Sequence, residues 1–254
     1  MKRHIPNTIT LCNLVCGCIA VRYAFCGQYV EALLFIVLGA VFDFFDGFTA
    51  RKLHVSSPVG VELDSLADLI TFGFAPSAMF YSLIGRLSPG CGAQCCPVAD
   101  GIAAHINVAA FLIVAFSALR LAKFNLDTRQ TTSFLGLPTP ANALLLSSVA
   151  IAFDRYFLGT AAPVSHSAGL TAVVVLLVIT LVSCALLVSE IPLFALKFKN
   201  FSWRDNAVRF VFLGASVLVL VASALTGIEN LTTGIGICII WYVVLSLVSA
   251  RKAK

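Results

Sequence analysis

Five acidic side chains lie close together in a stretch of the sequence that is otherwise apolar. Asp43, Asp46, Glu62, Asp64 and Asp68 fall within 26 positions, among phenylalanines and leucines. A carboxylate near the centre of a membrane helix costs about 2.5 to 3.5 kcal/mol on insertion, so the four aspartates together oppose insertion by roughly 10 kcal/mol. Hard divalent cations prefer carboxylate oxygen, and one or two such ions would offset this cost. The pattern therefore predicts a metal site built from the aspartates.

The spacing of the aspartates places them on two helix faces. Asp43 and Asp46 are separated by three positions, and Asp64 and Asp68 by four, so each pair shares one face of a helix. The connection of residues 51–58 is short, which predicts that the two helices are neighbours. Opposed in this way, the two faces would form a cage of carboxylates near one membrane surface, where water-soluble substrates and lipid headgroups meet.

Small residues flank the acids. Gly47, Ala50 and Gly60 remove side-chain bulk where the two helices approach each other. Two interpretations remain open, tight packing between helices and room for a ligand against the backbone. For the acids themselves the alternative is a solvated loop, but phenylalanines and leucines interleave them too densely for that interpretation.

The elements that must position these residues are membrane helices. The 254 residues are 59% hydrophobic and 11% charged, with a mean hydropathy of +0.98, which excludes an ordinary soluble enzyme, a disordered chain and a nucleic-acid-binding module. The apolar runs do not alternate, so they are helices rather than barrel strands. The sequence predicts an all-α polytopic bundle of about eight transmembrane helices, at about residues 6–26, 30–50, 59–84, 102–123, 137–158, 168–189, 208–226 and 230–250.

The basic residues predict an orientation for this bundle. With eight crossings both termini lie on one side, and 14 of the 17 lysines and arginines then fall on that side. By the positive-inside rule the termini and the acidic cluster face the cytoplasm. The first apolar run lacks a convincing cleavage site and is expected to remain as the first span. In the outer loop, Cys91, Cys95 and Cys96 leave a disulfide and a metal site as open alternatives.

The acidic segment as a whole resembles a known signature. The pattern D-x2-D-G-x2-A-R-x8-G-x3-D-x3-D of the CDP-alcohol phosphotransferases begins at Asp43, includes Arg51 and ends at Asp68, with every fixed position present. The resemblance implies a membrane enzyme that displaces CMP from a CDP-linked lipid with a hydroxyl acceptor, using Mg2+ or Mn2+, with two ions expected.

The resemblance also implies roles for single residues. The four aspartates, Asp43, Asp46, Asp64 and Asp68, would be the metal ligands, and Asp68 would also be the base that takes the acceptor's proton. The CDP moiety would be bound by residues of the signature and of the first helix: Gly47, Ala50, Arg51, Gly60, Asn7 and Thr8. For Asn7 and Thr8, capping of the first helix is the alternative.

Further stretches are similar to one branch of that family, the phosphatidylserine synthases. They are IPNTITLCN at residues 5–13, FGFAP at 72–76, RLAKFN at 120–125, FLGLPTP at 134–140 and KFK at 197–199. This branch implies CDP-diacylglycerol and L-serine as substrates. Arg120, Lys123 and Asn125, at the inner end of the fourth helix, are the candidates for binding the serine carboxylate or the lipid phosphate. For Lys123 the alternative is a basic residue that only flanks the helix, as the positive-inside rule predicts.

The predicted organisation is a single membrane domain. Residues 1–190 would form a catalytic core of six helices, and residues 191–254 would add two helices. Glycerol 3-phosphate or an inositol phosphate remains an alternative acceptor, and a cation transporter is the alternative from another class of protein. The expected location is a bacterial inner membrane, and the sequence leaves open whether the chain forms a homodimer.

Overall fold

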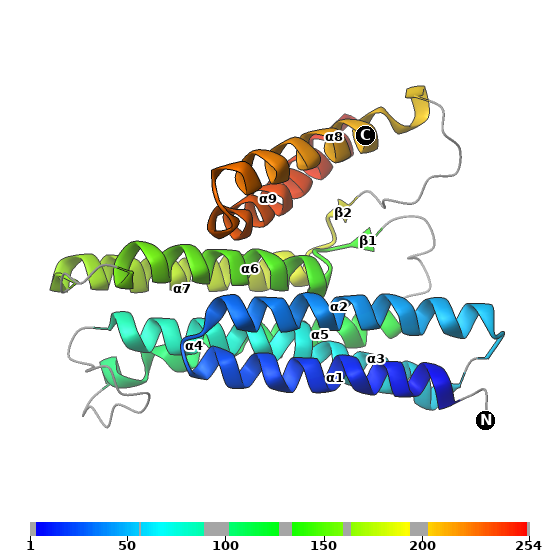
Figure 1. The fold of residues 1–254 in the computed structure, drawn as a ribbon, viewed down its shortest axis with the longest axis horizontal. Coiled ribbons are helices and arrows are strands. Elements are labelled where there is room, and N and C mark those ends of the chain that lie inside the picture. The colour runs from blue at the N-terminus through cyan, green and yellow to red at the C-terminus, as the bar shows by residue number, and fades with distance from the viewer. Residues whose placement is uncertain are drawn as a thin grey trace.

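The fold was obtained as a computed structural model, which describes residues 4–55, 57–88, 102–126, 134–159, 164–193 and 203–252. Nearly all of the described chain is helical (Figure 1). Eight helices in this part of the chain are long and apolar enough to cross a membrane, which confirms the predicted all-α polytopic bundle. The helical elements are α1 (His4–Phe25), α2 (Tyr29–Lys52), α3 (Pro58–Asp68), η1 (Leu69–Phe74), α4 (Ala75–Leu87), η2 (Ile102–Phe111), α5 (Leu112–Leu126), α6 (Thr139–Phe153), η3 (Asp154–Leu158), α7 (His166–Val188), α8 (Trp203–Thr226) and α9 (Ile228–Lys252).

The third span combines three of these elements. α3, the π-helix η1 and α4 run without interruption from Pro58 to Leu87. A π-helix has one more residue per hydrogen-bonded turn than an α-helix, and such turns occur often at functional sites. Here the wider turn begins directly after Asp68, the last residue of α3.

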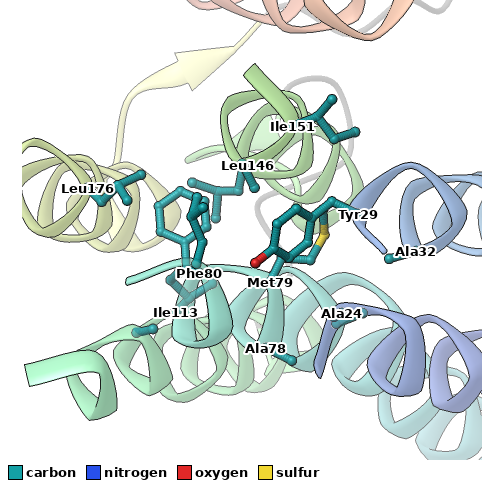
Figure 2. Packing of buried hydrophobic residues seen from close by; sticks show 14 of the residues in the cluster. Ala24, Tyr29, Ala32, Ala78, Met79, Phe80, Ile113, Leu146, Ile151 and Leu176 are labelled. Atoms are coloured by element: carbon teal, nitrogen blue, oxygen red, sulfur yellow. The ribbon is translucent and has the colours of Figure 1, made fainter. Parts of the chain in front are cut away.

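The apolar core lies in the half of the bundle away from the aspartates. Figure 2 shows how Tyr29, Met79, Phe80 and Leu146 meet between α2, α4 and α6. Small residues such as Ala24 and Ala78 allow α1 and α4 to approach. Lipid tails are as apolar as these side chains, so the hydrophobic effect does little to bring membrane helices together. Close packing of this kind is therefore a main source of their association.

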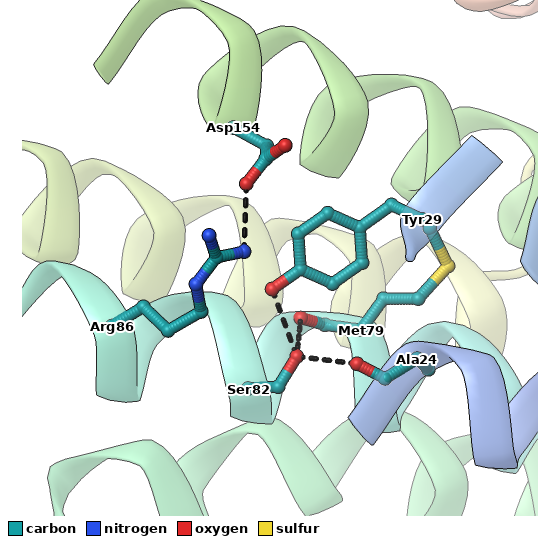
Figure 3. Close-up of polar contacts among 6 residues, drawn as sticks. All are labelled: Ala24, Tyr29, Met79, Ser82, Arg86 and Asp154. Carbon is teal, nitrogen blue, oxygen red and sulfur yellow. Dashed lines mark hydrogen bonds and ion pairs between the residues drawn. The ribbon is translucent and has the colours of Figure 1, made fainter. Parts of the chain in front are cut away.

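A polar network closes the end of the bundle that is far from the aspartates (Figure 3). Arg86 on α4 forms an ion pair with Asp154 of η3 at 2.8 Å, and its guanidinium lies 5.8 Å from the centre of the Tyr29 ring. Ser82 donates a hydrogen bond of 2.7 Å to the carbonyl oxygen of Ala24 and lies 2.8 Å from the hydroxyl of Tyr29. The network ties α1, α2, α4 and η3 together.

The C-terminal helices form a separate layer. α8 and α9 pack on each other as a hairpin, and α9 lies against α6 (Figure 1). Two short strands, β1 (Phe134–Leu135) and β2 (Pro192–Leu193), pair antiparallel at the base of this layer. The acidic residues belong to the other layer, in which α1 packs on α2, α3, η1 and α4.

Candidate metal and nucleotide site

Three aspartates meet at the end of the bundle where α2 ends and α3 begins. One carboxylate oxygen from each of Asp43, Asp64 and Asp68 lies within 4.8 Å of the other two. Oxygens on opposite sides of a bound Mg2+ are about 4.2 Å apart, so this spacing is close to the one that a divalent ion would need. One member of the predicted pair on α2 and both members of the pair on α3 thus come together.

Asp46 lies beside this trio rather than within it. Its side chain is buried, it interacts electrostatically with Asp64, and its Oδ2 accepts a hydrogen bond of 2.6 Å from the hydroxyl of Thr10 on α1. A second α1 side chain, Asn13, donates from Nδ2 to Asp68 Oδ1 at 3.2 Å. Thr10 and Asn13 are separated by three positions, so one face of α1 supplies a donor to two of the four aspartates.

The charge of the cluster is not neutralised by basic side chains. Within the described ranges, no lysine or arginine forms an ion pair with the four aspartates. Asp64 Oδ1 is buried and has no hydrogen-bond partner among the described residues. A buried carboxylate oxygen without a partner is costly, and a cation is the partner that carboxylate oxygens prefer. The residues present therefore fit a bound divalent metal.

A cavity of about 510 Å3 opens next to the aspartates. α2 and α3 make little direct contact, because both pack on α1 instead. The predicted neighbouring helices therefore approach each other through their side chains and leave space between their backbones. The cavity is lined by Pro6, Asn7, Thr10, Asp46, Gly47, Ala50, Arg51, His54, Val55, Ser57, Gly60, Val61 and Asp64.

The rim of the cavity is formed by the end of α2 and the start of α3. His54 follows the end of α2 with φ +51°, and its backbone N–H donates to Arg51 O at 3.2 Å, while the N–H of Val55 donates to Ala50 O at 3.0 Å. This closing motif usually has glycine at the left-handed position. Ser57 caps α3 by accepting a hydrogen bond of 3.0 Å from the N–H of Gly60.

The structure distinguishes between the two interpretations of the small residues. A Cβ built on Gly47 would meet only the Arg51 guanidinium, at 3.4 Å, and no atom of another helix. A Cβ on Gly60 would lie 3.0 Å from Ser57 Oγ and 3.2 Å from Asn7 Oδ1, both of which line the cavity. Gly60 therefore also allows a close approach to Asn7 of α1, whereas Gly47 and Ala50 line the cavity, and at Gly47 the structure favours room for a ligand over tight packing between helices.

Of the two predicted α1 residues, one lies at the cavity and one does not. Asn7 lines the cavity, whereas Thr8 is exposed and donates from its hydroxyl to His4 O at 2.9 Å. The alternative that both cap the helix is wrong, because α1 already begins at His4. The sequence interpretation did not single out Thr10, Asn13, His54 and Ser57 as site residues. For Thr10 and Asn13 a signal was present in the sequence, because they are two polar residues, three positions apart, within the apolar run of the first helix.

The three residues proposed from α5, Arg120, Lys123 and Asn125, have different surroundings. Arg120 is buried, interacts electrostatically with Asp68, donates to Thr139 Oγ1 at 3.4 Å and lies 5.2 Å from the centre of the Phe124 ring. Asn125 donates to the hydroxyl of Ser65 on α3 at 2.9 Å. Lys123 is exposed at the end of the same helix.

The remaining sequence candidates are Glu62, three cysteines and the KFK segment. Glu62, the fifth acid of the segment, is exposed and is not part of the metal-ligand group. Cys91, Cys95 and Cys96 fall outside the described residues, as does the KFK segment at 197–199.

Comparison with known proteins agrees with this geometry. The chain matches the CDP-alcohol phosphatidyltransferase family over residues 3–219. It is 36% identical over 155 residues, 61% of this chain and 80% of the relative, to the CDP-diacylglycerol–serine O-phosphatidyltransferase of Bacillus subtilis. The Helicobacter pylori protein of the same name is 35% identical over 153 residues, which are 59% of each chain.

A third relative has a different name. The archaetidylserine synthase of Methanothermobacter thermautotrophicus is 30% identical over 150 residues, 57% of this chain and 56% of the relative. The chain spans less than two thirds of the length of this protein and of the Helicobacter protein. The family match covers most of the chain and includes every residue of the acidic cluster and of its cavity. This chain belongs to the CDP-alcohol phosphatidyltransferase family.

Proposed function

We propose that this protein transfers the phosphatidyl group of CDP-diacylglycerol to the hydroxyl of L-serine, which yields phosphatidylserine and CMP and depends on Mg2+ or Mn2+. The observation that carries the proposal is the group of Asp43, Asp64 and Asp68, of which Asp64 also lines a cavity of about 510 Å3 at one end of the membrane helices. There an aqueous acceptor and a lipid-linked nucleotide can reach the same carboxylates. The names of the relatives from Bacillus and Helicobacter support serine as the acceptor.

The lining of the cavity suits a nucleotide diphosphate. Gly47, Ala50 and Gly60 leave room for the nucleotide, and the Arg51 guanidinium provides hydrogen-bond donors for its phosphates. Asn7 offers an amide that can donate to and accept from a nucleobase. These residues would hold the CDP group beside Asp46 and Asp64.

The four aspartates would hold the metal. When bound, it would neutralise the pyrophosphate and polarise the phosphorus that is attacked. In the reaction the serine Oγ forms a bond to the phosphorus that carries diacylglycerol, and the bond from that phosphorus to the CMP oxygen breaks. Asp68, at the junction of α3 and η1, would take the proton of the serine hydroxyl.

Arg120 is the residue that we assign to the acceptor. It is buried in α5 and interacts electrostatically with Asp68, and its one hydrogen bond within the described part of the chain is a long one to Thr139. A buried guanidinium with spare donors suits a carboxylate, and the serine carboxylate would then lie near the base. Asn125, through Ser65, would keep the end of α5 against α3. Nothing in the structure brings Lys123 to the cluster.

Product analysis tests the proposal. Purified protein is given labelled CDP-diacylglycerol with serine, glycerol 3-phosphate or an inositol phosphate as the sole acceptor, with and without chelator. We expect a lipid product with serine alone, lost on chelation and restored by Mn2+ or Mg2+. Asp43→Asn and Asp64→Asn should lose turnover, whereas Glu62→Gln, which removes a charge outside the cluster, should retain it. A product formed with another acceptor, or in undiminished amount by Asp64→Asn, would contradict the proposal.

A second measurement tests the assignment of Arg120. Arg120→Gln should raise the serine concentration for half-maximal rate by more than it raises that for CDP-diacylglycerol. Lys52→Gln, which removes an exposed charge at the same end of the bundle, is the matched control. An unchanged serine dependence in the Arg120 variant would mean that this residue does not bind serine and only helps to orient the helix in the membrane.

We further propose that the acidic end of the bundle faces the cytoplasm of a bacterial cell. The support is the distribution of basic residues, of which 14 of 17 lie on the side of the termini. Reporter fusions at Lys254 and after Arg86 should be active on opposite sides of the inner membrane. A periplasmic reporter at Lys254 would reverse the orientation. Homodimer formation remains a separate question, and cross-linking in membranes would answer it.

A further inference from the structure

We propose that Asn13 is a positioning residue, which holds the Asp68 carboxylate in the orientation that the transfer reaction needs. Asn13 Nδ2 donates to Asp68 Oδ1 at 3.2 Å, and the asparagine side chain is fully buried in α1. The inference depends on the proposed function only in requiring that Asp68 take part in catalysis.

A tight crossing of three helices fixes the position of Asn13. A Cβ built on Gly39 of α2 would lie 2.8 Å from Asn13 Oδ1 and 2.6 Å from Thr71 Cγ2. Thr71 of η1 in turn donates from its hydroxyl to the Asn13 carbonyl oxygen at 3.1 Å. Gly17 allows the same close approach, because a Cβ there would lie 2.9 Å from the Thr71 backbone. The side chain therefore has no space to take another rotamer.

The polarity of the contact follows from its partners. Asp68 Oδ1 can only accept a hydrogen bond when it is ionised, so the amide nitrogen, and not the amide oxygen, must face it. The amide oxygen then faces the backbone of α2 at Gly39, where it is buried without a hydrogen-bond partner among the described residues. The contact with Asp68 thus determines the orientation of the amide.

Asn13 is an expensive choice for the fold alone. A buried carbonyl oxygen without a partner destabilises the folded chain, whereas an apolar side chain of the same size would fill the space without that cost. Residues that violate local packing rules in this way are expected at functional sites. In return, Asn13 holds the Asp68 carboxylate through Oδ1. The other oxygen of Asp68 then keeps a constant direction relative to Asp43 and Asp64.

The test removes the amide. Asn13→Leu keeps the branch at Cγ, is larger than asparagine and removes the donor, whereas Asn13→Ala removes the donor with no risk of a clash. Both should lower kcat for CMP release about 10- to 100-fold, as expected for losing a hydrogen bond to a charged group, with little change in KM for CDP-diacylglycerol. The leucine variant should have a lower melting temperature, because its larger side chain enters a tight crossing, so the alanine variant shows whether the loss of kcat comes from the missing donor.

A control separates positioning from stability. Ser77→Ala removes a buried hydrogen bond of 2.8 Å, from Ser77 to Ala110 O, at a place remote from the carboxylates. It should lower the melting temperature but leave kcat unchanged. Binding of Mn2+ to the purified proteins, followed by the paramagnetic resonance of the free ion, gives a readout without turnover. It should weaken in both Asn13 variants and remain normal in the Ser77 variant.

The outcomes distinguish this inference from the proposed function. Because CMP release is measured, the test can be run with whichever acceptor the wild type uses, so an acceptor other than serine overturns the proposed function and not the role of Asn13. Wild-type kcat in either Asn13 variant, or full activity in Asp68→Asn, would overturn the role of Asn13. So would a loss of kcat that merely follows the loss of melting temperature seen in Ser77→Ala.

Discussion

Gly47→Ala is the substitution that best separates room for a ligand from packing between helices. In the structure a Cβ at this position meets only the Arg51 guanidinium, with Nη1 at 3.4 Å and Nη2 at 4.0 Å. These are ordinary contacts with the end of a flexible side chain. Alanine is favoured over glycine in a helix interior by about 1 kcal/mol, so the folded state should gain stability of that order.

The same methyl group would project into the cavity that Gly47 lines. If the bound nucleotide lies against this backbone, the overlap should cost about 1 to 3 kcal/mol, the usual cost of forcing a methyl group into filled space. That energy corresponds to a decrease in kcat/KM of about 5- to 150-fold. A variant that is more stable and less active is the expected combination.

The assay compares Gly47→Ala with Gly39→Ala. The second substitution places its Cβ 2.6 Å from Thr71 Cγ2 and 2.8 Å from Asn13 Oδ1, so it should lower the melting temperature. CMP release and thermal unfolding in detergent are measured for both. Unaltered kcat/KM in Gly47→Ala, or a lower melting temperature, would refute the assignment of the glycine to ligand space.

Three further substitutions test the surroundings of the site. Thr10→Val removes the hydrogen bond of 2.6 Å to Asp46, so kcat should fall about 10-fold or more, and Thr10→Ser should restore most of it. His54→Gly suits the left-handed backbone at φ +51°, so stability should be retained. The substitution also removes the imidazole ring from the cavity wall. Losing a contact of about 1 kcal/mol should raise KM for CDP-diacylglycerol about 5-fold. Asp154→Asn breaks the partly exposed ion pair with Arg86 at the far end, so it should lower stability by at most about 1 kcal/mol and leave KM unchanged. Unchanged kcat in the Thr10 variant, unchanged KM in the His54 variant or altered KM in the Asp154 variant would contradict the respective assignment.

Much of the fold could be predicted from hydropathy, because each span is a long apolar run with short polar connections. The π-helix after Asp68 could not be predicted, since a single wide turn leaves no mark on an apolar pattern of this length. The short connection predicted that α2 and α3 are neighbours, but it could not predict that both pack mainly on α1, because that packing involves small residues such as Gly17 and Gly39, whose partners are distant in sequence.

At the site, the aspartates and the small residues could be identified because their spacing is local. Thr10 and Asn13 act on carboxylates 36 and 55 positions away, and such partners are not visible in a linear pattern. His54 was missed for a different reason. Its significance comes from a backbone conformation that glycine usually adopts, and no rule of composition places histidine there.

The wide turn at Leu69–Phe74 changes the rotational setting between the two halves of the third span. The half from Pro58 to Asp68 presents Asp64 to the cavity, while the half from Ala75 to Leu87 presents Met79, Phe80 and Leu83 to the apolar interior. A regular helix would couple these two orientations, so that any residue inserted or deleted on one side would swing the other by about 100°. The extra residue in the wide turn offsets this angle, so Asp64 of α3 and the apolar side chains of α4 can face different neighbours on one continuous helix. A designer who rebuilds the apolar half of this span must therefore keep the wide turn if Asp64 is to stay at its cavity.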